Sequence, residues 1–313
     1  MRRMARAAVR RADAGTPTAV TTVRAALALV VLVMLVAGCS GAGPGPRRPG
    51  PRSVPAAAAY WNRIRLLGAL PLMDDGGRIP LPGESADSRP ARTDESLRVG
   101  ALFVHSAQGN HFCTASVVSS PGRDLLVTAA HCINGGHDGG YRSDIVFIPG
   151  YRDGQAPFGV WTVARLLVAP QWAKASDPDY DVGFVVLKPH DGQNIEDVLG
   201  ADRLGTDQQA DYLVHVTGYP DSDDTPITCV NWTSEHSRTQ LRFECSGFTG
   251  GTSGSPWVTR FSTQSRTGTI VGVIGGYQQG GDTPSVSYSV RFGPTVRGLY
   301  DRAAGIATAA HQG

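Results

Sequence analysis

Short apolar runs separated by turn-forming residues fill most of the chain from Arg98 onward. They have the length of strands, roughly four to eight residues, and few helical patterns lie between them. The predicted strands are 99–104, 112–118, 125–128, 144–148, 161–167, 182–187, 212–218, 240–245, 269–274 and 285–290, with a further strand starting at Trp257-Val258. This spacing predicts an all-β fold built as a double β-barrel.

The residues before this region follow a different pattern. Residues 55–70 are rich in alanine, leucine and aromatic side chains and predict a short helix. Asp74 to Ser96 is polar and rich in proline and glycine. We therefore interpret residues 55–97 as a short helix followed by a linker or pro-segment. The helix either docks on the domain that follows or acts as an inhibitory propeptide, and the sequence leaves both possibilities open.

The N-terminal region has the pattern of an export signal. Residues 1–24 are rich in arginine, and residues 25–38 form a run of fourteen apolar or small residues. A membrane span needs about 20 such residues, so this run fits the apolar core of a secretory signal better. It ends in Leu-Val-Ala-Gly-Cys at residues 35–39, which resembles the bacterial lipoprotein box.

That resemblance implies cleavage before Cys39 and attachment of lipid to this cysteine. Residues 1–38 would then be the signal peptide, and residues 39–54, which offer little to bury, a disordered tether. The protein would be exported and held by its lipid at the outer face of the bacterial cell membrane. Cleavage near Ala37, which would give a secreted protein, and an uncleaved anchor are the alternatives.

Composition narrows the class of protein and of partner. Charged residues make up 18% of the 313 residues, and 39 glycines and 21 prolines favour a loop-rich β protein. The net charge of +2 is a misleading clue to binding partners, because residues 1–38 contain six arginines and one aspartate. Since no basic stretch follows apart from Arg47, Arg48 and Arg52, we expect no nucleic-acid partner. Four histidines lack the spacing of metal ligands: His105, His111, His137 and His215. Neither a metal nor a cofactor is expected.

Three residue types that cooperate in nucleophilic catalysis stand at the borders of predicted strands. Ser253 lies in Gly-Gly-Thr-Ser-Gly-Ser-Pro, a sequence suited to a sharp turn that exposes a hydroxyl. A serine hydroxyl is a weak nucleophile and needs a neighbouring base, which in turn needs a group that orients it. His131 follows the strand 125–128, and Asp181 directly precedes the strand 182–187. The chain therefore offers all three groups, in the order His, Asp, Ser.

These motifs resemble those of the trypsin-like serine peptidases, and Gly-Thr-Ser-Gly-Ser-Pro looks closest to the bacterial glutamyl-endopeptidase branch. The resemblance covers residues 98–305. It implies a trypsin-like double barrel with a C-terminal helix at residues 294–310, and an endopeptidase that acts on peptides or proteins.

The resemblance also implies a role for each residue. His131 would accept the proton of Ser253 and later donate it to the leaving amine. Asp181 would hold the imidazole in the correct tautomer. The backbone N–H groups of Gly251 and Ser253 would form the oxyanion hole.

Neighbouring residues compete for two of these roles. Asp177 and Asp179 compete with Asp181, which we prefer because the apolar strand starts directly after it. Ser255 competes with Ser253, but Ser255 stands at what is commonly a glycine position in the family and precedes a proline.

Substrate preference is only thinly encoded. Ile274, Gly275 and Gly276 align with the strand that edges the primary specificity pocket, and the glycines would leave this edge free to pair with an extended peptide. Glutamyl endopeptidases carry a histidine near Ile274, so its replacement argues against glutamate specificity. Residues 246–249, near the pocket floor, contain no carboxylate, which argues against lysine or arginine specificity. Thr252 stands where many relatives have the aspartate that receives a new N-terminus, so activation by that route is not expected.

The five cysteines divide into two pairs and one remainder. Cys113 and Cys132 flank the strand that leads to the histidine, and Cys229 and Cys245 flank a short alternating segment before the serine turn. We predict that each pair forms a disulfide, which suits an oxidising compartment. Cys39 is left over for the lipid.

The leading hypothesis is a lipid-anchored, extracytoplasmic serine endopeptidase. The alternative from another class is a catalytically silent binding module of the same fold, displayed on the cell surface. An esterase with the same triad fits the chemistry, but hydrolases of that kind usually carry the three residues in the order Ser, Asp, His.

Overall fold

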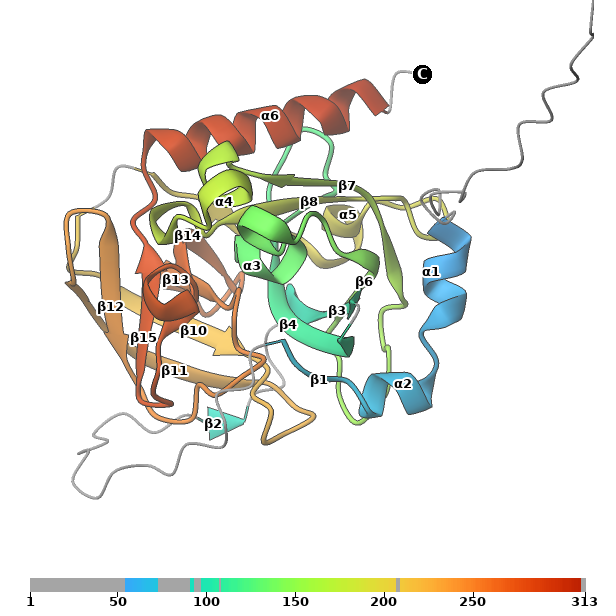
Figure 1. Ribbon diagram of the computed structural model, residues 1–313, viewed down its shortest axis with the longest axis horizontal. Helices are drawn as coiled ribbons and strands as arrows, with labels where there is room; N and C mark the ends of the chain where they lie inside the picture. Colours follow the sequence, from blue (N-terminus) through green and yellow to red (C-terminus); the bar gives the residue numbers. More distant parts are fainter. Residues whose placement is uncertain (1–53, 73–90, 93–96, 107, 207–208, 311–313) are drawn as a thin grey trace, which may run out of the picture. The chain divides into compact units, whose positions relative to one another are not determined.

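The alternating runs of the sequence fold into two strand-rich halves, green and orange in Figure 1. The computed structural model describes residues 54–72, 91–92, 97–106, 108–206 and 209–310, all within the unit Pro49–Gly313. The expected signal peptide, the tether up to residue 53, Cys39 and most of the linker 73–96 lie outside the described residues.

The first half is a closed barrel. Its strands are β3 (Val99–Ser106), β4 (Gly109–Val118), β5 (Leu125–Thr128), β6 (Ser143–Pro149), β7 (Trp161–Val168) and β8 (Gly183–Leu187). They follow the order β4-β3-β6-β7-β8-β5, and β5 closes the ring by pairing with β4 at residues 116–118. All four side chains of β5 are buried, and inward-facing side chains such as Leu102, Phe147 and Trp161 fill the interior.

The second half is built in the same way. Its strands are β10 (Leu213–Gly218), β11 (Ile227–Glu235), β12 (Gln240–Glu244), β13 (Pro256–Ser262), β14 (Thr267–Val273) and β15 (Val286–Val290), in the order β15-β12-β11-β10-β13-β14. The end strands meet where the N–H of Val273 donates to Ser289 Oγ at 2.9 Å. Two short strands extend this sheet: β9 (Arg203–Leu204) pairs with β14, and β2 (Ala91–Arg92) pairs with β11. The two barrels confirm the predicted double-barrel architecture.

Helices occupy the connections and the C-terminus. Those in the connections are α3 (Ala130–Ile133), α4 (Pro170–Ala175) and α5 (Ile195–Leu199), with short 3₁₀ turns at η1 (Gly136–Asp138), η2 (Pro178–Tyr180) and η3 (Tyr277–Gly280). The predicted C-terminal helix is α6 (Pro294–Ala310), which runs along the top of Figure 1 and buries Val296, Leu299 and Ala303 in a core shared with β8 and the second sheet. No helix among the described residues has the length and apolar character to cross a membrane.

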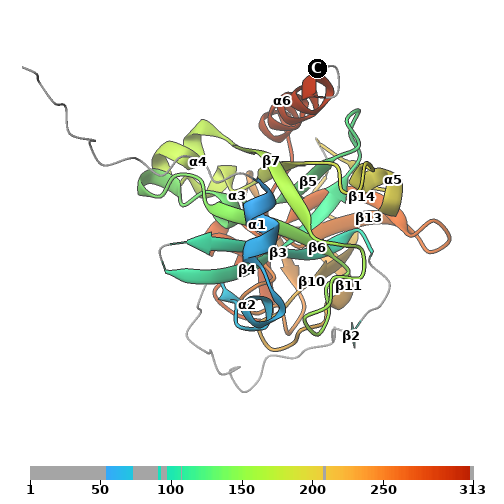
Figure 2. The ribbon, with the colours of Figure 1, turned by 90° about the vertical axis from the view of Figure 1, so that its right-hand side faces the viewer.

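The N-terminal segment docks on the first barrel. The single helix predicted at 55–70 is instead two helices, α1 (Val54–Tyr60) and α2 (Arg63–Leu67), followed by the short strand β1 (Leu70–Pro71). The helix breaks at Trp61-Asn62, because Asn62 caps α2 by accepting the N–H of Arg65 at 3.0 Å. Trp61 is buried and donates its indole N–H to the carbonyl of Asp144 at 2.6 Å. Figure 2 shows α1 lying against the first barrel.

One long strand was not predicted. β11 (Ile227–Glu235) alternates between buried and exposed positions over its first half, but three polar residues, Asn231, Thr233 and Ser234, interrupt its apolar pattern. It is held by tertiary pairing with β10 at residues 227–232 and with β12 at residues 233–235. Pairing with neighbouring strands therefore determines the strand conformation of β11 more than its own sequence pattern does.

Candidate active site

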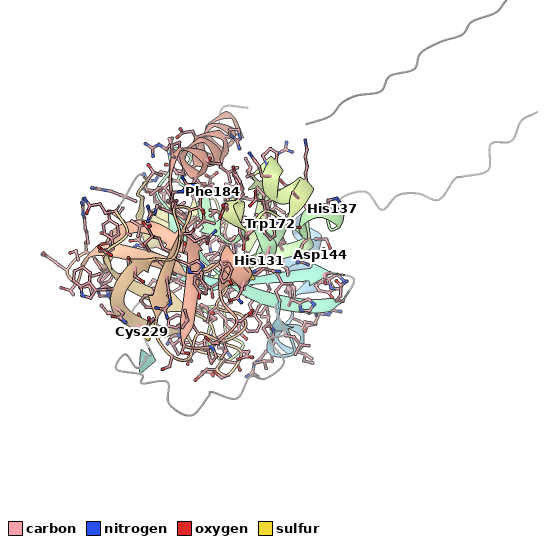
Figure 3. All side chains as sticks on the ribbon, turned by 60° about the vertical axis from the view of Figure 1, so that its left-hand side comes forward. His131, His137, Asp144, Trp172, Phe184 and Cys229 are labelled. Carbon is pink, nitrogen blue, oxygen red and sulfur yellow. A yellow bond between two sulfur atoms is a disulfide. The ribbon has the colours of Figure 1, made fainter. Side chains whose placement is uncertain are left out.

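His131 is delivered to the border of the two barrels by β5. After the buried strand the backbone of Ala129 stays extended, and α3 then makes a single turn that carries the histidine. The hydroxyl of Thr128 donates to the carbonyl of Thr114 at 2.8 Å and fixes the end of the strand. His131 is only 3% exposed. Trp172 from α4 lies near it (Figure 3), and the centroids of the two rings are 6.4 Å apart.

The carboxylate of Asp181 holds this histidine through two hydrogen bonds. Oδ1 accepts the backbone N–H of His131 at 2.9 Å, and Oδ2 lies 2.8 Å from His131 Nδ1. Because a carboxylate only accepts, Nδ1 carries the hydrogen and Nε2 is left as the basic nitrogen. Oδ2 also accepts the N–H of Gly276 at 2.9 Å. These three donors compensate the burial of Asp181, which is fully buried.

The competing aspartates point elsewhere. Asp177 caps η2 by accepting the N–H of Asp179 at 3.0 Å. Asp179 Oδ1 accepts the side-chain amide of Gln240 at 2.8 Å. The structure therefore brings Asp181, and neither of its neighbours, against His131.

Ser253 lies on a tight turn that requires glycine at two positions, one before and one after the serine. Gly251 and Gly254 have φ values of +88° and +86°, in the left-handed region that favours glycine. A Cβ on Gly251 would overlap the ring of Phe112 and approach the carbonyl of Tyr219 to 2.7 Å. A Cβ on Gly254 would overlap the carbonyl of Thr114. The turn thus fits tightly against β4 of the first barrel.

Backbone contacts set Ser253 beside the histidine helix. The N–H of Thr114 donates to the carbonyl of Ser253 at 2.8 Å, and Cys132 Sγ lies 3.7 Å from the same oxygen. Within the described residues, Ser253 Oγ makes no hydrogen bond to His131, and the buried Nε2 of His131 has no partner. Such catalytic hydrogen bonds are often long in a free enzyme and tighten when substrate binds.

Ser255 is committed to the turn itself. It is fully buried, and its hydroxyl donates to the carbonyl of Thr252 at 2.6 Å. Of the two candidate serines, it therefore has the structural role.

The N–H groups around Ser253 fall into two sets. Those of Thr252, Gly254 and Ser255 donate to backbone carbonyls at 3.2, 2.7 and 3.0 Å. Those of Gly251 and Ser253 donate to no group in the described part of the chain. Two free donors on one tight turn can stabilise negative charge on an oxygen placed between them.

The two predicted disulfides are present. Cys113 in β4 pairs with Cys132 in α3, and Cys229 in β11 pairs with Cys245 just after β12. The first one ties the helix of His131 to the strand that contacts Ser253. Among the described residues, the only cluster of metal-ligating types is Cys113, His131 and Cys132, and both sulfurs are used in this disulfide. That cluster therefore has no thiolate to offer a metal.

The predicted substrate-binding edge is only partly available. The N–H of Gly275 donates to the carbonyl of Tyr288 at 3.0 Å, and that of Gly276 donates to Asp181. The N–H of Tyr277 donates to Gln240 Oε1 at 3.2 Å. The expectation of a free edge is therefore wrong for the N–H groups of Gly275 and Gly276. Ile274 is buried in the core of the second barrel.

Two further residues at the site, Gln240 and Arg142, belong to no motif of the sequence. Gln240 is only 4% exposed and links η2 to the edge at Tyr277 through the carbonyl of Pro178 and the carboxylate of Asp179. Arg142 donates from Nε and Nη2 to the carbonyl of His131 at 3.2 and 3.1 Å, and burial lowers the pKa of this arginine. Both residues form hydrogen bonds to other segments of the chain, and the sequence around each residue gives no sign of these bonds.

Comparison with known proteins agrees with this geometry. The Trypsin family matches residues 89–292. The solved protease Anisep from Arthrobacter nicotinovorans is 26% identical, covers 69% of this chain and 99% of its own, and superposes with a TM-score of 0.63. The thermostable serine protease AL20 from an extremophilic microorganism is 25% identical and covers 68% of this chain and 99% of its own, with a TM-score of 0.62.

A more distant structure has the same fold. A Glu endopeptidase is 14% identical, covers 71% of this chain and 98% of its own, and has a TM-score of 0.55. Comparison with curated protein sequences gives no match.

Proposed function

Because the chain belongs to the trypsin family, we propose that it is a serine endopeptidase that hydrolyses peptide bonds in peptides or proteins through an acyl-enzyme. The observation that carries this proposal is the geometry around His131. Asp181 fixes its Nδ1 side, its Nε2 is unpaired, and the turn of Ser253 lies against the same helix. The family's fold and the two related proteases support it.

In the proposed mechanism, Ser253 Oγ attacks the carbonyl carbon of the scissile bond while its proton passes to His131 Nε2. Asp181 keeps the imidazole oriented and stabilises the imidazolium that forms. The N–H groups of Gly251 and Ser253 bind the developing oxyanion, and loss of one such donor typically costs about 2.7–4 kcal/mol. The imidazolium then protonates the leaving amine. A water molecule, activated by the same histidine, hydrolyses the acyl-enzyme and regenerates Ser253.

Kinetics on an unfolded protein substrate test this mechanism. Ser253→Ala and His131→Ala should each lower kcat severely, on the order of 10⁶ where such a triad acts as a unit, and the double variant should lose little more. Ser255→Ala is the matched control, because its hydroxyl only supports the turn. Equal losses in Ser253→Ala and Ser255→Ala would reject the nucleophile. A wild-type protein that cleaves nothing, even after trimming of residues 39–97, would favour the silent binding module.

We also propose that the enzyme works outside the cytoplasm, anchored through lipid on Cys39. The support is the lipoprotein-like sequence that ends at this cysteine, together with the two disulfides, which suit an oxidising compartment.

A further inference from the structure

One edge of β4 carries the catalytic turn and the N-terminal segment side by side. At Thr114 the N–H donates to the carbonyl of Ser253 at 2.8 Å. At Phe112 the carbonyl accepts the N–H of Leu72 at 3.1 Å. Residues two apart on a strand direct their backbone groups to the same edge, about 7 Å apart. Leu72 and Ser253 therefore bond to neighbouring positions on the same edge of β4. From residue 116 onward this edge pairs with β5.

The N-terminal segment is firmly held in this position. β1 runs parallel to β4, with Leu70 opposite His111 and Pro71 opposite Phe112. The carbonyl of Pro71 lies 3.3 Å from His111 Nδ1. Upstream, Leu66 is buried.

The hydroxyl of Tyr60 strengthens this docking. It donates to Asn110 Oδ1 at 2.7 Å and lies 3.1 Å from His105 Nδ1. Together with the buried Trp61, these contacts make the segment a folded part of the first barrel.

The covered edge lies on the side from which the leaving amine departs. Ile274–Gly276, on one side of the Ser253 turn, is the expected edge for the acyl part of a substrate. The other side of the turn faces β4, because the ring of Phe112 packs on Gly251. The substrate residues that follow the scissile bond would therefore extend along β4. There the N–H of Leu72 already bonds to the carbonyl of Phe112.

A groove remains open next to this covered edge. It has a volume of about 830 Å³ and is lined by Leu72, His105, His111, Gly135, Tyr141 and Arg142, among others. Arg142 is the residue that also holds the carbonyl of His131. The groove thus adjoins both β1 and the catalytic helix.

We propose that β1, through the N–H of Leu72, determines specificity on the leaving-group side. It takes the backbone position on β4 that an extended substrate would otherwise use for strand addition. Residues after the scissile bond gain no pairing with β4 and lie in the groove between Leu72 and Arg142. The inference rests on the proposed function, and it makes β1 a permanent wall of the cleft instead of a removable pro-segment.

The test compares Leu72→Pro, which lacks the N–H that bonds to Phe112, with Leu70→Ala, which keeps this N–H and changes an exposed side chain of β1 that does not line the groove. The proline ring would stand where the N–H of Leu72 now meets the carbonyl of Phe112, so this end of β1 should leave β4, while the buried Trp61 and Leu66 keep the upstream segment docked. Two substrates share one acyl sequence, taken from a site that the enzyme cuts in an unfolded protein. One ends in a p-nitroanilide, and the other continues for four residues past the scissile bond.

Leu72→Pro should raise kcat/KM for the long substrate relative to the anilide by about tenfold, as one to two regained backbone hydrogen bonds would. Leu70→Ala should leave this ratio as in wild type. An unchanged ratio in an active Leu72→Pro protein would overturn the inference and leave the proposed function intact. If wild type neither hydrolyses the substrates nor reacts with a fluorophosphonate, the proposed function fails and the inference fails with it.

A second measurement covers the case in which Leu72→Pro does not fold. Wild-type kcat/KM is measured on substrates with one to four residues after the scissile bond. The value should level off after the first or second residue, because β4 offers no further pairing. A rise of several-fold with each added residue would overturn the inference.

Discussion

At the scale of single residues, the carboxylate of Asp181 links the two barrels. It accepts two hydrogen bonds from His131 in the first barrel and one from Gly276 in the second. A fully buried carboxylate is stable only with such donors around it. The same bonds that stabilise Asp181 also set the orientation of the imidazole, so structure and proposed chemistry depend on one side chain.

Asp181→Asn should keep the fold but lower kcat severely, on the order of 10⁴ in the best-known protease triad. An amide offers only one acceptor oxygen and can hold the imidazole in the wrong tautomer. Asp179→Asn is the control, since its carboxylate bonds only to Gln240 among the described contacts. Steady-state kinetics with circular dichroism of both variants checks this. Equal activity in the two variants would contradict the role given to Asp181.

The contact between Asp181 and His131 could be predicted from sequence because both residues stand at the border of a strong apolar run. Asp181 lies two residues before β8, and the turn of Ser253 is marked by Gly251 and Gly254, whose positive φ values favour that residue type. Gln240 and Arg142 could not be predicted. Their roles come from hydrogen bonds to segments that are distant in sequence or irregular in structure, and neither residue type signals such a role locally.

At the scale of elements, the disulfide Cys113–Cys132 connects β4 to α3 across 19 residues. Replacing both cysteines by serine should lower the free energy of unfolding by about 3 kcal/mol. Activity should fall as well, because α3 carries His131. The matched control replaces Cys229 and Cys245, which close a loop of similar length away from α3. Urea unfolding and kinetics of both double variants check this, and an equal loss of activity in the two would contradict the link to α3.

Asp202, which directly precedes β9, should make the stability of the protein depend on pH. Asp202 is 4% exposed, and burial raises the pKa of its carboxyl, although the N–H of Gly268 and the charge of Arg98 oppose the shift. The folded state therefore binds this proton more tightly than the unfolded state. Its contribution to stability is present below the ordinary carboxyl pKa and is lost as pH rises through the raised one.

Asp202→Asn, which cannot ionise and still accepts from Gly268, should therefore become more stable than wild type as pH rises above the ordinary carboxyl range. Urea unfolding of both proteins from pH 3 to pH 7 measures the difference, with the sign set by linkage. A difference that stays constant, or that moves in favour of wild type with rising pH, would contradict the assignment to Asp202.

Most strands could be predicted because each barrel buries one face of an alternating pattern. β11 was missed because Asn231, Thr233 and Ser234 interrupt that pattern. The break between α1 and α2 was missed because it depends on the cap at Asn62 and on the pocket that buries Trp61. Both features depend on tertiary contacts, which local propensity does not report.

At the scale of the whole molecule, the candidate site exists only where the two barrels meet. His131 and Asp181 come from the first barrel, and Ser253 and Gly276 from the second. The hydroxyl of Thr114 joins them further by donating to the carbonyl of Gly251 at 3.0 Å. We therefore expect activity to be lost together with the contact between the barrels.

The anchoring proposal also belongs at this scale. Cys39→Ala should release the protein from the membrane fraction of its host or stall its processing, because Cys39 is the one cysteine of the five that the two disulfides do not use. Wild type should partition into detergent and carry a lipid mass on its N-terminal peptide. A soluble wild-type protein that begins at a residue other than Cys39 would contradict this prediction.

Whether Ser253 is an activated nucleophile can be measured by labelling the folded wild-type protein with a fluorophosphonate, followed by peptide mapping. Such a reagent reacts with a serine that has an activated hydroxyl and a working oxyanion hole. We expect one label, on Ser253, that is lost in Ser253→Ala and severely slowed in His131→Ala. No labelling of the folded protein, or a label on Ser255, would contradict it.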